Sequence, residues 1–154
     1  MRGPAVMLAA VAAAAVVTAA DRRADASVLA FASDVTVLQS QGGVRPVADV
    51  VGDLLSLRGH GTTDLALALR AARRQLDRGA GGERVAVLLS DCLATVGDAP
   101  LAATAGIERL HVLGTSAEHE SVAAGRTLAR HCAGRYALVE SVTDVPKALN
   151  AVLS

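Results

Sequence analysis

Aromatic residues are nearly absent from this sequence: its 154 residues include one Phe, one Tyr and no Trp. Proteins that bind single-stranded nucleic acid stack bases on aromatic side chains, so this class is disfavoured. An aromatic-lined site for carbohydrate or lipid is disfavoured for the same reason. The sequence also lacks an excess of positive charge, because 15 Lys and Arg residues are balanced by 15 Asp and Glu residues. A strongly basic nucleic-acid binder, which neutralises phosphates, is therefore disfavoured as well.

Cysteines and catalytic motifs are also scarce. A disulfide-stabilised secreted domain would carry more cysteines than Cys92 and Cys132, which are predicted to be free thiols in a reducing compartment such as the cytoplasm. No Walker A, GxGxxG, GxSxG or HExxH pattern occurs, so nucleotide binding and these hydrolase mechanisms have no motif support. The histidines lack the spacing of metal ligands; they are His60, His111, His119 and His131.

Small aliphatic residues make up most of the chain. Apolar residues account for 52% of the sequence and charged residues for 19%, which argues against intrinsic disorder. The length fits a single domain, residues 1–154, that can bury a core. Because the apolar residues are chiefly Ala, Val and Leu, we expect a core of small aliphatic side chains.

The first twenty residues allow three interpretations. Arg2, the apolar run Ala5–Val17 and the small residues before Asp21 fit a secretory signal, which would make the mature protein a secreted domain. A transmembrane helix is disfavoured, because the run is short and alanine contributes little to insertion. The third interpretation is a buried helix that packs on the sheet of an α/β domain. Composition alone does not distinguish the secretory signal from the buried helix.

Strand and helix patterns alternate along the rest of the chain. Strands are predicted at Val28–Ala32, Val35–Leu38, Arg84–Leu89, Arg109–Leu113 and Tyr136–Val139. Helices are predicted at Val47–Leu57, Asp64–Leu76, Val122–Cys132 and Asp144–Leu153, with a loop and a short helix over Asp98–Ala105. This order predicts an α/β fold with an open, doubly wound, Rossmann-like and mostly parallel sheet flanked by helices. His111, inside a predicted buried strand, is expected to be a hydrogen-bonded core residue.

In such a fold, functional groups lie in the loops at the carboxyl ends of the strands. Two loops of this kind are Ser90-Asp91-Cys92 and Gly114-Thr115-Ser116, and a third segment, Gly61-Thr62-Thr63-Asp64, precedes a predicted helix. Taken singly, these segments have simple structural interpretations. Thr63 or Asp64 would cap the helix, and Asp91 would be an exposed turn residue.

Taken together and in this order, the segments resemble the von Willebrand factor A domain. That family binds a metal ion at an adhesion site formed by an Asp-x-Ser-x-Ser motif, a threonine in a Gly-Gly-Thr-Asp-like loop and an aspartate after a later strand. The segment Gly61-Thr62-Thr63-Asp64 is similar to the second part and Ser90-Asp91-Cys92 to the third, so the resemblance implies Thr63 and Asp91 as metal ligands. The resemblance covers the whole chain and is strongest for bacterial versions encoded beside MoxR-type AAA+ ATPases.

The sequence departs from the family at its start. The Asp-x-Ser-x-Ser motif is absent, and the chain looks as if it begins one residue after it, so the N-terminal run is interpreted as the family's first helix. The domain is then expected to be N-terminally incomplete and to lack a central strand between Val28–Ala32 and Arg84–Leu89. Those two strands must either close on each other or leave open edges that tend to pair with other strands.

This departure weakens the implied metal site. Mg²⁺ prefers six oxygen ligands, and only Thr63 and Asp91 remain, so Mg²⁺ is expected to bind weakly if at all. Cys92 occupies a position at which the family usually has glycine. No basic residue adjoins it to lower the pKa of the thiol, so we interpret Cys92 as a tolerated small side chain.

The resemblance implies a non-catalytic protein-binding module in the cytoplasm, with neither a nucleic acid nor a membrane as its target. The implied partner is a protein, either a MoxR-type AAA+ ATPase or an acidic surface whose carboxylate completes the shell of the metal ion. Two alternatives stay open. One is an enzyme or nucleotide-binding protein with Asp91, Thr115 and Ser116 lining a Rossmann-like crevice, and the other is a secreted domain whose residues 1–20 are cleaved.

Overall fold

The elements follow the predicted order. The computed structural model of the chain describes residues 4–23, 25–57 and 62–154. Its helices and strands are α1 (Pro4–Arg23), β1 (Val28–Phe31), β2 (Val35–Gln39), α2 (Val47–Ser56), α3 (Leu65–Asp77), β3 (Val85–Ser90), the 3-10 helix η1 (Pro100–Thr104), β4 (Arg109–Gly114), α4 (His119–His131), β5 (Tyr136–Leu138) and α5 (Asp144–Leu153). Each predicted strand and helix is present with small shifts of its ends, and the doubly wound α/β fold is confirmed.

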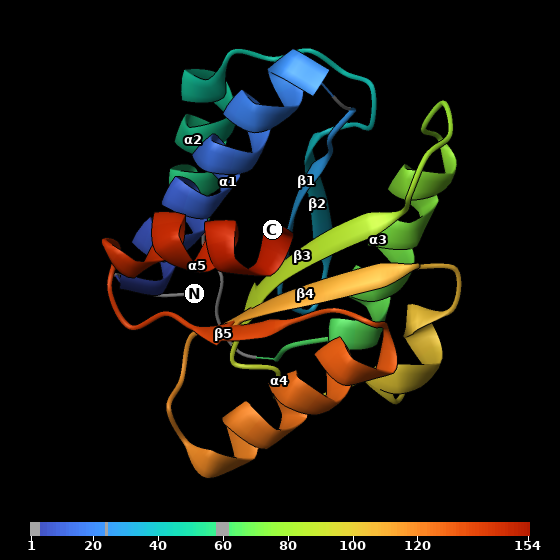
Figure 1. Cartoon of the computed structure of the whole chain (residues 1–154), viewed down its shortest axis with the longest axis vertical. Coiled ribbons are helices and arrows are strands. Elements are labelled where there is room, and N and C mark those ends of the chain that lie inside the picture. Colours follow the sequence, from blue (N-terminus) through green and yellow to red (C-terminus); the bar gives the residue numbers. More distant parts are fainter. Residues whose placement is uncertain (1–3, 24, 58–61) are drawn as a thin grey trace.

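The strands β3, β4 and β5 form a parallel sheet in the order β3-β4-β5. Helices α3 and α4 lie on one side of this sheet and α1 and α5 on the other (Figure 1). Residues 110–114 of β4 are buried, as expected for a parallel strand covered on both faces. The carboxyl ends of β3 and β4 therefore bring the loops after Ser90 and Gly114 to one edge of the fold.

The strands β1 and β2 form a separate antiparallel hairpin. The tight turn at Ser33-Asp34 is closed by a hydrogen bond of 2.9 Å from the Ala32 amide to the Asp34 carbonyl oxygen. In the described residues, β1 pairs only with β2, and β3 pairs only with β4. The sheet is thus divided at the place where the sequence predicted a central strand to be missing, and the two flanking strands do not close on each other.

The alanine-rich N-terminal segment is the core helix α1, in agreement with the third interpretation of its sequence. It packs against α2 and α5, and Ala10, Ala12 and Ala13 are buried. Alanine lets the neighbouring elements approach closely because it has only a methyl group. No helix among residues 4–23, 25–57 and 62–154 has the length and apolar character needed to cross a membrane.

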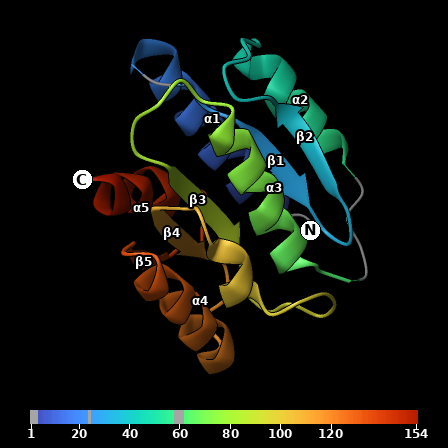
Figure 2. The same cartoon turned by 90° about the vertical axis from the view of Figure 1, so that its right-hand side faces the viewer.

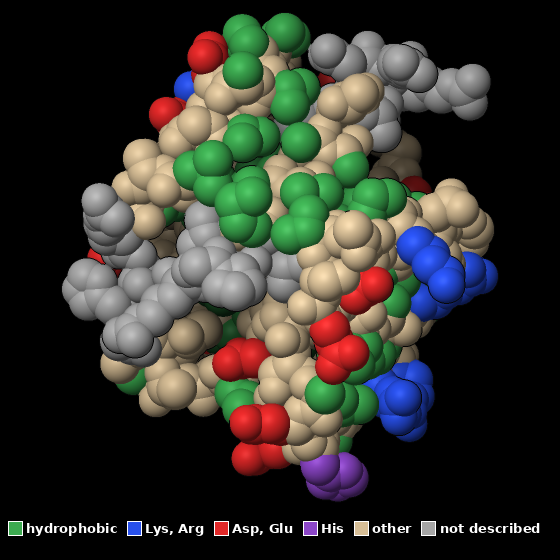
Figure 3. Space-filling view, turned by 90° about the vertical axis from the view of Figure 1, so that its left-hand side faces the viewer, with side chains coloured by type: hydrophobic (Ala, Val, Ile, Leu, Met, Phe, Trp, Pro, Cys, Tyr) green, Lys and Arg blue, Asp and Glu red, His purple; other side chains and the backbone are tan. Residues whose placement is uncertain are grey.

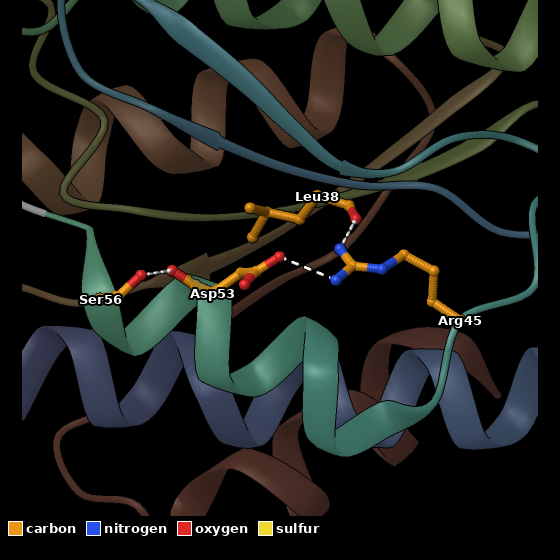
Figure 4. Close-up of polar contacts among 4 residues, drawn as sticks. All are labelled: Leu38, Arg45, Asp53 and Ser56. Carbon is orange, nitrogen blue, oxygen red and sulfur yellow. Dashed lines mark hydrogen bonds and ion pairs between the residues drawn. The ribbon is translucent and has the colours of Figure 1, made fainter.

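Helix α2 is held beside the hairpin by Arg45. Its guanidinium donates hydrogen bonds to the carbonyl oxygen of Leu38 in β2 and, at 2.8 Å, to the carboxylate of Asp53 in α2 (Figure 4). The Ser56 hydroxyl donates to the carbonyl oxygen of the same Asp53 at 2.8 Å. Arg45 therefore covers part of the outer edge of β2, which limits pairing of that edge with other strands.

The side of the molecule that carries α1 and α2 exposes many apolar side chains (Figure 3). Met7 is 48% exposed in α1 and Leu55 is 45% exposed in α2. Single exposed apolar residues are ordinary, but gathered ones mark surfaces that are suited to contact with another molecule.

Candidate functional site

The segment before α3 combines a helix cap with a link to β1. The Asp64 carboxylate accepts a hydrogen bond of 2.9 Å from the Leu67 amide, which caps the helix. The Asp64 amide donates to the carbonyl oxygen of Ala32 at 2.8 Å. The cap interpretation is therefore confirmed for Asp64, and Thr63 precedes the cap. His60 and Gly61, from the same predicted loop, lie outside the described residues.

The loop after β3 turns sharply at Asp91 and Cys92. The Asp91 carboxylate accepts a hydrogen bond of 3.0 Å from the Leu93 amide, and the Ser90 hydroxyl accepts one of 3.0 Å from the Cys92 amide. The Asp91 side chain is otherwise exposed, as predicted for a turn aspartate. Cys92 has φ +63, in the left-handed region that favours glycine.

Thr95 joins this loop to Thr63. Its hydroxyl accepts a hydrogen bond of 2.7 Å from the Thr63 amide, and its amide donates to the Thr63 carbonyl oxygen at 3.0 Å. The amide of Val96 donates to the same oxygen at 3.3 Å. Thr63 is thus hydrogen-bonded to the loop that begins at Asp91, and we call these two joined segments the loop cluster. Sequence reasoning missed Thr95, because nothing in its local pattern indicates a contact with a residue 32 positions earlier.

The oxygen donors of this cluster do not fit a tightly held Mg²⁺. Asp91 supplies one carboxylate, one oxygen of which already accepts from Leu93, and Thr63 supplies a neutral hydroxyl. Among the residues with described placement, no group of three or more His, Cys, Asp or Glu side chains is positioned to hold a metal ion. An octahedral shell of six oxygens would need most of its ligands from elsewhere.

Cys92 lies beneath the loop rather than on its surface. The side chain is 4% exposed, and burial, followed by the charge of Asp91, raises the pKa of its thiol to about 12. The thiol therefore stays protonated at neutral pH and is a poor nucleophile. This agrees with the interpretation of Cys92 as a tolerated small side chain.

The end of β4 packs beneath Tyr136. A Cβ atom at Gly114 would lie 2.1 Å from the Tyr136 hydroxyl oxygen, so only glycine fits there. The Arg126 guanidinium of α4 lies 5.7 Å from the centre of the Tyr136 ring, and burial raises the pKa of this tyrosine.

Two hydrogen bonds hold the loop that follows Gly114. The Thr115 amide donates to the Ser90 carbonyl oxygen at 3.1 Å, and the Ser116 hydroxyl accepts from the Glu118 amide at 3.2 Å.

A shallow groove of about 510 Å³ opens beside this loop cluster. It runs between α4, η1 and the loop after β3, and its lining is mainly apolar. The lining residues are Cys92, Leu93, Ala94, Pro100, Leu101, Glu120, Ala123, Ala124, Thr127 and Leu128.

His111 behaves as predicted for a core histidine. It is 4% exposed in β4, and its Nδ1 accepts a hydrogen bond of 3.1 Å from the Arg135 amide. Burial lowers the pKa of its imidazole below 6.5, and the positive charges of Arg109 and Arg135 lower it further. The negative charge of Glu83 has the opposite effect. His119 and His131 are exposed at the two ends of α4.

Solved structures share this arrangement. An aerotolerance-related membrane protein from Bacteroides fragilis NCTC 9343, solved with multiple mutations to serine, superposes with a TM-score of 0.70 at 19% identity, over 96% of this chain and 87% of that one. Proximal thread matrix protein 1 from the mussel byssus superposes with a TM-score of 0.68 at 14% identity, over 97% of this chain and 41% of that one. The chain therefore shares the α/β fold of these structures. No protein-family model and no curated protein sequence matches the chain.

Proposed function

We propose that the chain is a non-catalytic protein-binding module, whose binding face consists of the loop cluster around Thr63, Asp91 and Thr95 together with the adjacent apolar groove. The hydrogen bonds between Thr63 and Thr95 carry this proposal, because they hold two loops from distant parts of the sequence as one rigid surface. A pre-organised surface loses little conformational entropy when a partner binds.

The chemistry of this face supports binding rather than catalysis. The Cys92 thiol is buried, with its pKa raised to about 12, and Asp91 is an exposed carboxylate that holds a turn. The groove is shallow and mainly apolar, which suits a protein side chain better than a reacting polar substrate.

The partner that we propose is a MoxR-type AAA+ ATPase, as the resemblance implies, or another protein with an acidic surface. Because Thr63 and Asp91 are the only metal ligands that the resemblance implies here, we propose that Mg²⁺ binds weakly and only with help from a carboxylate of the partner. We also propose a reducing compartment such as the cytoplasm, which the two free cysteines support.

The test measures binding of the purified chain to the purified MoxR-type ATPase of the same genome by biolayer interferometry, with and without millimolar Mg²⁺. Thr127→Arg places a long side chain in the groove, and Asp91→Asn removes the charge of the loop. In millimolar Mg²⁺, we expect each variant to weaken binding by about tenfold or more, or about 1.4 kcal/mol. The matched control is Val44→Asp, at a position that is 86% exposed in the loop between β2 and α2, and it should leave binding unchanged. Equal binding of the wild type and both site variants would contradict the proposed face.

A further inference from the structure

A second groove, of about 390 Å³, lies between α3 and η1. Figure 2 looks onto α3, and η1 packs against it. The α3 wall of the groove consists of Arg70, Arg73, Arg74 and Asp77. These positions follow the i, i+3, i+4, i+7 pattern of a single helix face. Three guanidinium groups therefore border the same groove.

The other wall of the groove is small and apolar. It consists of Ala102, Ala103 and Ala105, in η1 and directly after it. A Cβ atom at Gly106, which has φ +86, would lie 2.5 Å from the Nε atom of Arg73. The Arg73 side chain thus packs on the Gly106 backbone, which holds its guanidinium beside the groove, and the alanine methyl groups leave room for the side chains of a ligand.

Asp77 neutralises the arginine wall only in part. One of its oxygens lies 3.6 Å from the Nε atom of Arg73, beyond hydrogen-bond distance, and the other pairs with Arg84 at 2.8 Å. Within residues 4–23, 25–57 and 62–154, Arg74 forms no ion pair. Its guanidinium is exposed and available to a carboxylate from another molecule.

Arg70 is paired with Asp98, in the loop before η1, at 2.8 Å. The Asp98 side chain is 70% exposed, and an ion pair in water contributes little stability, so a carboxylate of a ligand can replace it at little cost. The carboxylates of Asp77 and Asp98 thus serve four arginines, which leaves the groove positive although the net charge of the chain is zero.

We propose that the groove between α3 and η1 binds an acidic segment of a partner protein, which lies extended along α3 with carboxylates at alternate positions. Guanidinium groups bind carboxylates through paired hydrogen bonds. Arg70 and Arg74 are separated by about 6 Å along the helix axis. Alternate side chains of an extended peptide are about 7 Å apart, so each of the two arginines meets one carboxylate.

Two observations favour a peptide at this place over single-stranded nucleic acid. Among the described residues that line the groove, none is aromatic, so bases have no side chain on which to stack. The alanine wall suits the small apolar side chains that alternate with the carboxylates. The groove has no lining residue in common with the groove of the proposed function, so a negative result at either one leaves the other untouched.

The test measures binding of the fluorescein-labelled peptide Gly-Ala-Asp-Ala-Asp-Ala-Asp-Ala-Gly to the full chain by fluorescence anisotropy at low ionic strength. Arg74→Gln should raise the Kd by about fivefold or more. The matched control, Lys147→Gln, removes one positive charge from α5 on the other side of the sheet and should leave the Kd unchanged. Asp98→Asn releases Arg70 and should lower the Kd by about threefold, whereas Asp49→Asn in α2 should not. All four variants change exposed side chains, so each is expected to fold.

Four outcomes would overturn the proposal. The first is the absence of saturable peptide binding, and the second is an equal rise of the Kd in Arg74→Gln and Lys147→Gln, which would show attraction to net charge alone. The third is equal binding of a peptide of the same composition with its three aspartates adjacent, since its carboxylates do not match the arginine spacing. The fourth is displacement of the peptide by an equal or lower concentration of a single-stranded oligonucleotide with the same number of charges, which would assign the groove to nucleic acid.

Discussion

The backbone at Cys92 allows a sharp test of the loop geometry. With φ +63, this residue adopts a left-handed conformation that costs a residue with a Cβ atom about 1–2 kcal/mol relative to the right-handed one. Glycine avoids this cost. Replacing Cys92 with Gly and, separately, with Ala therefore compares two small residues that differ in whether they tolerate this φ.

The expected difference follows from two opposing effects. The Cys92→Gly variant gains about 1–2 kcal/mol of relief relative to Cys92→Ala, but glycine loses about 0.4–1 kcal/mol through the greater freedom of its unfolded chain. Both variants lose the buried sulfur, so that loss cancels in the comparison. The Gly variant should thus be at least as stable as the Ala variant, with an advantage of up to about 1.6 kcal/mol.

The measurement is chemical and thermal unfolding of both variants, with Gly52→Ala as the matched control. Gly52 lies in α2, and a Cβ atom there would meet nothing within 4 Å. The Gly52→Ala variant should therefore be more stable than the wild type by about 0.5–1 kcal/mol. Alanine is thus favoured over glycine at position 52, whereas glycine is favoured over alanine at position 92. If Cys92→Ala is more stable than Cys92→Gly, as alanine is expected to be at position 52, the left-handed conformation at Cys92 is refuted.

Three further predictions concern other parts of the structure. A Cβ atom at Gly134 would lie 1.8 Å from the carbonyl oxygen of Leu110, so Gly134→Ala should lower the free energy of unfolding by at least about 2 kcal/mol in urea titrations; a variant as stable as the wild type would refute this packing. The pKa of His111 is lowered in the folded state, so the unfolded chain takes up the proton first and stability should fall as the pH drops through 6.5 toward the folded pKa. The His111→Asn variant offers an acceptor oxygen near the place of Nδ1, and it should lose this decline in unfolding curves recorded between neutral and mildly acidic pH; an unchanged decline would assign it to other groups. Calorimetry with millimolar Mg²⁺ or Mn²⁺ should give no stoichiometric heat of binding to the chain alone, and a tight saturable isotherm would show that ligands besides Thr63 and Asp91 are present.

Local patterns were enough to predict most of the fold. The continuous apolar runs around Val87 and Val112 identified the parallel strands, and Asp64 identified the start of α3, because capping and burial depend on a few neighbouring residues. His111 was also predictable, since a polar side chain inside a buried strand must find a partner.

Contacts between segments that are distant in the sequence could not be predicted from it. The contact between Thr63 and Thr95 joins two loops, and the left-handed turn at Cys92 is an unusual choice for a residue with a side chain. Neither is encoded by local propensity. The resemblance to the von Willebrand factor A domain selected Thr63 and Asp91, but only the folded geometry shows that Thr95 joins Thr63 to the loop that begins at Asp91.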